Sequence, residues 1–262
     1  MTVIVAFYCA DGVVVAADSM ITPAIGEIAV GHHHGRKIEI LSGPQLFAFA
    51  GDHGQSARFK YLADRHHALI PGTCHAIDFP LTITREIIEQ FASTGIDLSR
   101  IDVSTVLSYA HDGHHHCCVF EGPLQPRLLD RNHFYVALGS GKLSADPFLR
   151  FLVDVFCTEG MPRLSDATFL AVWTVQHVID TNSGGVAPPI RVAIFHADES
   201  GQYVARELPD EDIGEHQLAR EGAVAALRER RRELHGDVGR QMVIADKPSL
   251  NPEANKKPSD ET

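Results

Sequence analysis

Three residues near the start of the chain have the types and spacing of a nucleophilic catalytic group: Thr2, Asp18 and Lys37. If Met1 is removed, Thr2 becomes the first residue and carries both a hydroxyl and a free α-amino group. The pKa of an α-amino group is ordinarily about 7.7–8.0, so this amine can accept the hydroxyl proton at neutral pH. A single residue then supplies the nucleophile and its base.

Asp18 and Lys37 have the charges needed to support such an amine. A lysine beside the amine favours its neutral, basic form by like-charge repulsion, and a carboxylate holds that lysine in place. Gly51 ends an apolar segment before a helical pattern, where backbone N–H groups are placed to donate to an oxyanion. Taken singly, Asp18 is equally compatible with a turn residue and Lys37 with a solvated lysine, since charged side chains are mostly exposed.

Strand and helix patterns alternate in blocks around these residues. Apolar β-rich segments, turn residues and helical spacing predict strands, two helices, strands, two helices and closing strands. The predicted strands are 2–9, 13–17, 37–41, 45–50, 103–110, 116–121, 134–138, 190–196 and 203–206, and the predicted helices are 55–69, 82–92, 145–157 and 166–179. This order favours an α+β domain in which each sheet covers its apolar face with another layer.

The character of the sequence changes near residue 210. We expect one domain over residues 1–209, followed by a charged helical extension over 210–245, in which Glu215 to Glu233 is the strongest helix former. Residues 246–262 are rich in Pro, Lys, Asn and acidic residues and have little to bury, which predicts a disordered tail.

Composition narrows the class of protein. Apolar residues make up 44% of the chain, as in globular proteins, and the net charge of −11 argues against nucleic-acid binding, which needs clustered Lys and Arg. The chain has neither a stretch shaped like a signal peptide nor one of membrane-spanning length, so we expect a cytoplasmic protein with no membrane partner. Its five cysteines are predicted to be free thiols: Cys9, Cys74, Cys117, Cys118 and Cys157.

Four motifs occur in the order typical of one known family. They are the start Thr-Val-Ile-Val-Ala with Asp-Gly-Val-Val-Val-Ala-Ala-Asp-Ser, then Lys37-Ile38, Gly139-Ser140-Gly141, and Asp180-Thr-Asn-Ser183-Gly-Gly. Together they resemble the proteasome β-type N-terminal-nucleophile threonine peptidases. Within that family the chain looks closest to the bacterial proteasome homologue that accompanies an ATP-dependent two-component peptidase. The resemblance covers Thr2 to about Arg206.

The resemblance implies a four-layer αββα sandwich of the N-terminal-nucleophile hydrolase type, which acts on peptides or unfolded proteins. It also implies subunits in double-stacked rings, an unidentified ATPase or unfoldase as a possible partner, and neither cofactor nor metal. The implied roles are nucleophile for Thr2, core catalytic group for Asp18 and Lys37, support of the terminal amine for Ser140, Asp180 and Ser183, and oxyanion binding for Gly51.

Two other functions remain open. The Gly-Asp-His-Gly turn at Gly51 and the inserted His32-His33-His34 are compatible with a compartment or binding protein whose site is weak or idle. The same fold also hosts acylases, so a non-peptidase amide hydrolase is the third hypothesis.

Two further motifs suggest chemistry that we reject. The histidine runs at 32–34 and 114–116 contain metal-ligating side chains, but adjacent residues of a strand point to opposite faces, which favours hairpin or interface positions. The segment Gly139-Ser-Gly-Lys142 is similar to a phosphate loop, but Leu143 stands where Ser or Thr must follow the lysine.

Overall fold

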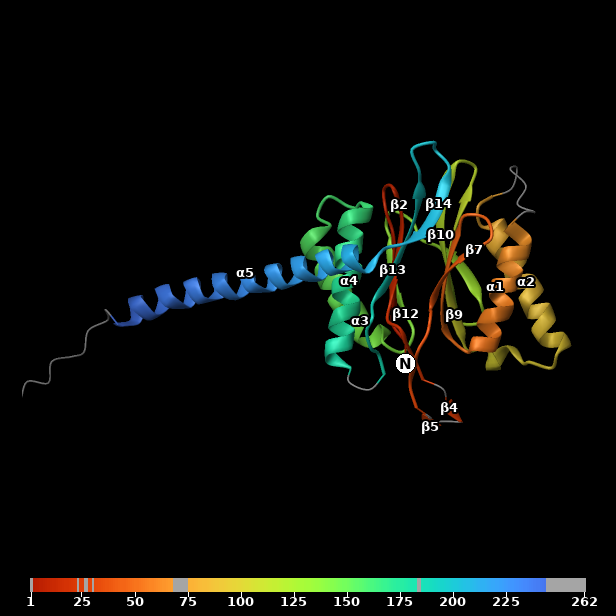
Figure 1. Cartoon of the computed structure of the whole chain (residues 1–262), viewed down its shortest axis with the longest axis horizontal. Coiled ribbons are helices and arrows are strands. Elements are labelled where there is room, and N and C mark those ends of the chain that lie inside the picture. The colour runs from red at the N-terminus through yellow and green to blue at the C-terminus, as the bar shows by residue number, and fades with distance from the viewer. Residues whose placement is uncertain are drawn as a thin grey trace, which may run out of the picture. The chain divides into compact units, whose positions relative to one another are not determined.

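The protein is a mixed α/β structure, as the sequence predicts, and its sheets are antiparallel (Figure 1). The computed structural model describes residues 2–22, 24–25, 28–29, 31–67, 75–182 and 185–243. The tail predicted for residues 246–262 therefore lies outside the described residues. The chain divides into two compact units, Met1–Arg220 and Glu221–Thr262, and the first of them contains both large sheets.

The first five-stranded sheet contains the first two and the last two strands of the chain as the structure describes it. Its strands, in spatial order, are β12 (Tyr135–Leu138), β1 (Ile4–Tyr8), β2 (Gly12–Ala17), β13 (Arg191–Ala197) and β14 (Tyr203–Glu207). The predicted hairpin at the start of the chain forms β1 and β2, with Ile4 opposite Ala17. Strand β1 is also paired with β12, which brings Leu138 opposite Ile4 and places the turn after β12 beside Thr2.

The second five-stranded sheet is also antiparallel throughout. Its strands are β11 (Gln125–Leu128), β10 (His114–Glu121), β9 (Val103–His111), β8 (Gln45–Gly51) and β7 (Ile38–Leu41). The sequence patterns did not predict β11, which contains Pro126. This proline is tolerated because β11 lies at the edge of the sheet and pairs with β10 alone.

Two small strand pairs lie between β2 and β7 along the chain, and the sequence patterns predicted neither. They are β3 (Met20–Ile21) with β6 (His33–His34), and β4 (Ala24–Ile25) with β5 (Ile28–Ala29). Strands of two residues are too short for a period of two to be recognisable.

Helices cover the outer face of each large sheet. Helices α1 (His53–His67) and α2 (Asp78–Ser93) pack against the second sheet, and α3 (Lys142–Phe156) and α4 (Leu164–Thr181) pack against the first. Figure 1 shows the α3/α4 pair, the two sheets and the α1/α2 pair in that order. A 3₁₀ helix, η1 (Leu98–Arg100), follows α2, and α5 (Asp210–Val243) ends the described chain.

Within the described residues, one apolar cluster joins the two sheets and another joins the second sheet to its helices. One lies between the sheets and joins side chains such as Val15 and Phe195 to Leu46 and Val106. The other joins the second sheet to α1 and α2 through residues including Phe47, Phe59, Ile83, Ile87 and Phe120. Because the strands of both sheets are covered on two faces, β2 is buried along its whole length and reads as a continuous apolar segment.

Among the helices of the described residues, none is both long enough and apolar enough to cross a bilayer.

Candidate active site

Thr2 is held by the Gly139-Ser140-Gly141 turn, which connects β12 to α3. The backbone nitrogen of Thr2 donates to Ser140 Oγ at 3.1 Å, and the Gly141 N–H donates to the Thr2 carbonyl at 2.9 Å. Gly139 has φ of +84°, and a Cβ there would collide with the Thr2 carbonyl. The two glycines let the turn approach Thr2 closely enough for Ser140 to reach its nitrogen.

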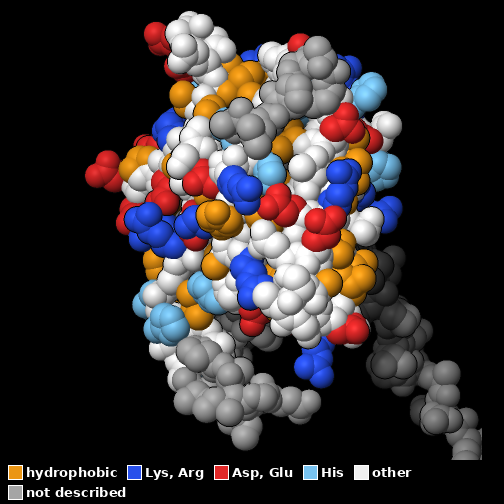
Figure 2. Space-filling view, turned by 90° about the vertical axis from the view of Figure 1, so that its right-hand side faces the viewer, with side chains coloured by type: hydrophobic (Ala, Val, Ile, Leu, Met, Phe, Trp, Pro, Cys, Tyr) orange, Lys and Arg blue, Asp and Glu red, His pale blue; other side chains and the backbone are white. Residues whose placement is uncertain are grey.

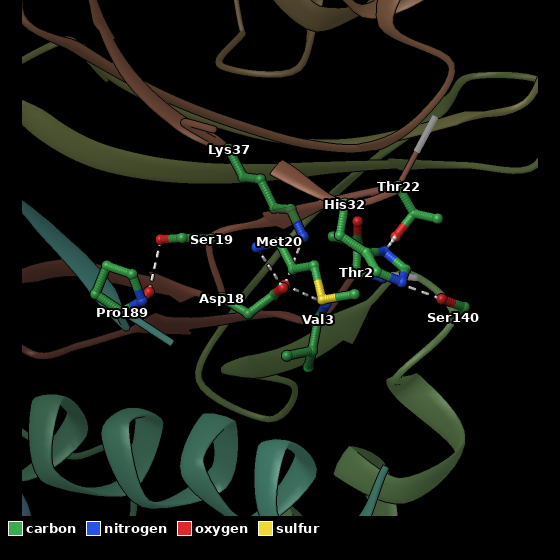
Figure 3. A network of polar contacts seen from close by, with 10 residues as sticks. All are labelled: Thr2, Val3, Asp18, Ser19, Met20, Thr22, His32, Lys37, Ser140 and Pro189. Carbon is green, nitrogen blue, oxygen red and sulfur yellow. Dashed lines mark hydrogen bonds and ion pairs between the residues drawn. The ribbon is translucent and has the colours of Figure 1, made fainter. Parts of the chain in front are cut away.

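Asp18 follows β2, and its carboxylate binds three other residues of the site (Figure 3). The residue is 1% exposed, and its carboxylate accepts from the Val3 N–H at 2.9 Å and the Met20 N–H at 3.0 Å. Lys37 Nζ donates to the same carboxylate at 2.7 Å. A buried charge needs such partners, so Asp18 ties the Thr2–Val3 segment to Lys37.

Lys37 precedes β7 and is 4% exposed. The Phe49 N–H donates to the Lys37 carbonyl at 3.1 Å and anchors its backbone to β8. Burial lowers the pKa of the Lys37 ammonium, and the Asp18 carboxylate offsets part of that effect. Figure 3 shows the Lys37 side chain pointing towards the Asp18 carboxylate.

A pocket of about 1100 Å³ opens at this group. Thr2, Lys37, Gly51 and Ser140 all line it, although they come from widely separated parts of the sequence. The other lining residues are Ile21, Thr22, His33, Phe49, Ala50, Asp52, His53, Asp102, Ser104, Glu121, Leu138, Gly139 and Lys142.

Gly51 ends β8 at the edge of the pocket with φ of +108°. A Cβ there would collide with the Asp102 carbonyl, so this position accepts only glycine without movement. The neighbouring Asp52 N–H already donates to that carbonyl at 2.6 Å. Of these two backbone groups, the N–H of Gly51 is the candidate oxyanion donor.

Asp180 is not joined to Thr2 by any contact in the described structure, although the sequence motif predicts a role beside it. Asp180 lies at the end of α4, its side chain is 53% exposed, and it does not line the pocket. Its carboxylate accepts from Gln176 Nε2 at 2.7 Å and from Arg220 NH1 at 3.3 Å. Ser183, the other residue of that motif, lies outside the described residues.

The sequence patterns missed several features of the site. They gave no indication that Val3 and Met20 hold Asp18 by their backbone N–H groups, because any residue can supply such a donor. They also missed the ion pair of Lys142 with Glu121, 2.8 Å long, at the pocket wall.

The inserted histidines lie beside the site. His33 pairs with Ile21 in the β3–β6 ladder and lines the pocket, and His32 Nδ1 is 3.1 Å from Thr22 Oγ1. In the second run, His114 faces His111 across the β9–β10 hairpin. No three His, Cys, Asp or Glu side chains of the described chain are grouped so that they could hold a metal ion.

Comparison with known proteins shows the fold but not the family. No family model and no curated protein match the chain. A solved structure of the Anbu (Gly-1) mutant from Hyphomicrobium sp. strain MC1 is 14% identical, with a TM-score of 0.67 over 90% of this chain and 100% of that one. The helical assembly of the Anbu complex from Pseudomonas aeruginosa is 17% identical, with a TM-score of 0.65 over 94% and 98% of the chains. A second Hyphomicrobium Anbu structure is 15% identical, with a TM-score of 0.64 over 87% and 97%.

These comparisons correct the family suggested by the sequence motifs. Anbu is a bacterial proteasome-like protein that forms a family of its own, so the assignment to the proteasome β-type peptidases and their bacterial homologue is wrong. The motifs misled because they are short, so that they fit the shared fold rather than one family.

Proposed function

We propose that this chain is an amide hydrolase of the N-terminal threonine type, folded as a four-layer αββα sandwich of the N-terminal-nucleophile hydrolase type. One observation carries the proposal: Ser140 and the Asp18–Lys37 ion pair gather around the Thr2–Val3 segment at the mouth of a large pocket. Burying a lysine and a carboxylate costs free energy, and a fold does not need a buried ion pair in order to be stable.

In this proposal Thr2 Oγ attacks the carbonyl carbon of an amide, and its proton passes to the α-amino group of the same residue. The amine leaving group then takes that proton, which leaves an ester between Thr2 and the acyl group. Water hydrolyses the ester, again with the amine as base. Lys37 keeps the α-amino group neutral through its charge, and Ser140 orients that group through the hydrogen bond at 3.1 Å.

The N–H of Gly51 is the proposed donor to the oxyanion. Asp180 has no part in this version of the mechanism, because its described contacts are with Gln176 and Arg220. The proposed substrates are peptides or unfolded proteins, which fit a pocket of about 1100 Å³.

A second candidate is a proteasome-like compartment or binding protein with an idle site. The comparisons fit this candidate better than the hydrolase, because sequence identities of 14–17% support a shared fold but give no support for a shared activity. The separation of Asp180 from Thr2 is the structural observation in its favour.

We further propose that the protein is a homo-oligomer. One of the similar structures is a helical assembly of the Anbu complex, which supports association of copies of this chain. Electron microscopy of the purified protein distinguishes a helical arrangement from the double-stacked rings implied by the motifs. An ATPase or unfoldase partner remains a proposal to be tested by co-purification.

The hydrolase proposal is tested by mass spectrometry in two steps. Intact mass first shows whether Met1 has been removed, since a retained Met1 excludes the α-amino mechanism. A peptide epoxyketone or boronate is then added to the processed protein, and we expect a covalent adduct on Thr2 that Thr2→Ala abolishes.

Ser42→Ala serves as the matched control, because Ser42 lies in the β7–β8 turn outside the pocket. A processed protein without an adduct would support the idle compartment. Turnover of small acyl amides without turnover of peptides would indicate an acylase instead.

A further inference from the structure

The pocket at Thr2 has an apolar part and an acidic part. Ile21 and Phe49 are apolar residues of its wall, and the ring of His53 packs edge-on against Phe49 with centroids 4.9 Å apart. Asp52 and Asp102 line the same pocket, and both are exposed. Apolar surface beside carboxylates suits a ligand side chain that has an apolar stem and a cationic end.

The two acidic residues lie next to Gly51, the proposed oxyanion donor. Asp52 directly follows Gly51, and Gly51 pairs with Val103, the residue after Asp102, in the β8–β9 ladder. The Asp52 N–H donates to the Asp102 carbonyl at 2.6 Å, and the Asp102 N–H donates to Gln55 Oε1 at 2.9 Å. These bonds keep the backbones of both acidic residues together beside Gly51.

The charges that line the pocket do not cancel. Lys37 and Lys142 each donate to a carboxylate, at 2.7 and 2.8 Å, so their charges are already balanced. Among the described residues, no Lys, Arg or His side chain forms an ion pair with Asp52 or Asp102. The pocket therefore has an excess of negative charge beside Gly51, and a cleft strengthens the field of such an excess.

The outer face over α1 and α2 has a different distribution of charge. Figure 2 looks at that face and shows Lys and Arg side chains interspersed with Asp and Glu. Some of these charges are paired within the chain, as Arg65 is with Glu86. A cationic ligand meets charges of both signs there, so the acidic excess distinguishes the pocket from this face.

We propose that Asp52 and Asp102 select substrates with arginine or lysine on the acyl side of the amide that is cut. The inference rests on the proposed function, in which the Gly51 N–H binds the carbonyl oxygen of that same residue. Its side chain then starts beside the two carboxylates. The aliphatic stem lies against the Ile21 and Phe49 side of the pocket, and the cationic end forms charge-assisted hydrogen bonds with Asp52 and Asp102.

Equilibrium binding tests this selectivity without any chemical step. Fluorescence anisotropy of labelled peptides is measured with the full-length Thr2→Ala protein, which lacks the nucleophile. The peptides differ at one position, which is arginine, citrulline, leucine or glutamate, and citrulline has the shape of arginine without its charge. We expect the arginine peptide to bind about tenfold more tightly than the citrulline peptide, and the glutamate peptide to bind most weakly. Equal affinities, or no binding of the arginine peptide, would overturn the inference.

Two conservative substitutions test the acidic residues themselves. Asp102→Asn keeps the contacts described for Asp102, which are made by its backbone, and Asp52→Asn keeps an acceptor for the Gln55 N–H, which Asp52 Oδ1 binds at 2.8 Å. Each should reduce the preference for arginine over citrulline about threefold, and the double variant should abolish it.

Asp112→Asn is the matched control, because Asp112 is exposed in the β9–β10 turn outside the pocket. It removes the same charge and should leave the preference unchanged, and circular dichroism checks that every variant is folded. A double variant that is folded and still prefers arginine would overturn the role of the two carboxylates.

This inference and the proposed hydrolase fail in different ways. An adduct on Thr2 together with equal peptide affinities would support the hydrolase and overturn the selectivity. A preference for arginine in binding, without an adduct on the processed protein, would support the acidic pocket and overturn the hydrolase.

Discussion

The ion pair between Lys37 and Asp18 is the residue-scale feature on which the site depends. The two side chains are 3% and 0% exposed, so neither charge is stabilised by water. Lys37 Nζ lies 2.7 Å from the Asp18 carboxylate, which also accepts the N–H groups of Val3 and Met20. Removal of one partner leaves a buried charge uncompensated, which is far more costly than loss of a surface pair.

We predict that Asp18→Asn lowers the free energy of unfolding by about 3–5 kcal/mol, because the Lys37 ammonium then stays buried beside a neutral amide. Urea unfolding followed by circular dichroism measures this loss. Glu39→Gln, which breaks the partly exposed pair with Lys60, is the control and should cost less than about 1 kcal/mol.

The double variant with Asp18→Asn and Lys37→Met should be more stable than Asp18→Asn alone, since it also removes the buried ammonium that the neutral amide does not balance. Equal losses for Asp18→Asn and Glu39→Gln would contradict the burial of the pair.

At the scale of the element, the β9–β10 hairpin carries a cluster of imidazoles at its turn. His116 lies against Tyr109 with ring centroids 5.6 Å apart, and His111 is its other ring neighbour. Burial is the main reason why the pKa of His116 is lowered to about 4. The charges of His111, His115 and His114 lower this pKa further, whereas a hydrogen bond to the His111 backbone raises it. The folded hairpin therefore keeps His116 neutral at a pH where the unfolded chain binds a proton.

The way in which stability depends on pH follows from this difference in proton binding at His116 between the folded and unfolded states. Between pH 6.5, the ordinary pKa of histidine, and about pH 4, the unfolded state binds more protons at His116 than the folded state. The contribution of His116 to stability is thus complete above pH 6.5 and decreases as the pH falls towards 4.

We predict that His116→Gln makes the loss of stability between pH 6.5 and pH 4 less steep than in the wild type, because glutamine takes up no proton. Urea unfolding at a series of pH values gives the two slopes. His114→Gln, at the exposed end of the same strand, should leave the slope close to that of the wild type. Parallel curves for His116→Gln and wild type would show that His116 titrates alike in both states.

For the whole molecule, the division at residue 220 has a consequence for folding. Residues 1–220 form one compact unit that contains both sheets, α1 to α4 and every residue of the pocket. The ion pairs described within the second unit join residues of one helix: Arg230 with Glu233 and Arg232 with Glu229. Such i,i+3 pairs support a helix only weakly.

We predict that a chain ending at Arg220 folds on its own, with a melting temperature within a few degrees of the full-length protein. Its far-ultraviolet circular dichroism should lose helical signal corresponding to the missing part of α5, and the Asp180–Arg220 pair should be kept. Thermal unfolding of both chains provides the measurement. A truncated protein without a cooperative transition would show that the second unit is needed for the first to fold.

Local patterns were sufficient to predict most elements. The hairpin of β1 and β2, the strands around Lys37 and Gly51 and helices α1 to α4 are found close to their expected positions, because periodicity and turn residues depend only on near neighbours. Boundaries were less accurate: α2 begins at Asp78 rather than Thr82, because the sequence pattern did not reveal that Phe79 and Pro80 are buried.

The sequence by itself determined which residue types and turns are available: Thr2, Asp18, Lys37 and the Gly139–Gly141 turn, in that order. Only the tertiary structure decided which of them meet. Ser140 reaches Thr2 across 138 residues because β12 pairs with β1, whereas Asp180 is held by Gln176 and Arg220 although it belongs to an equally recognisable motif. Contacts between distant residues depend on how sheets and helices pack, and short motifs do not contain that information.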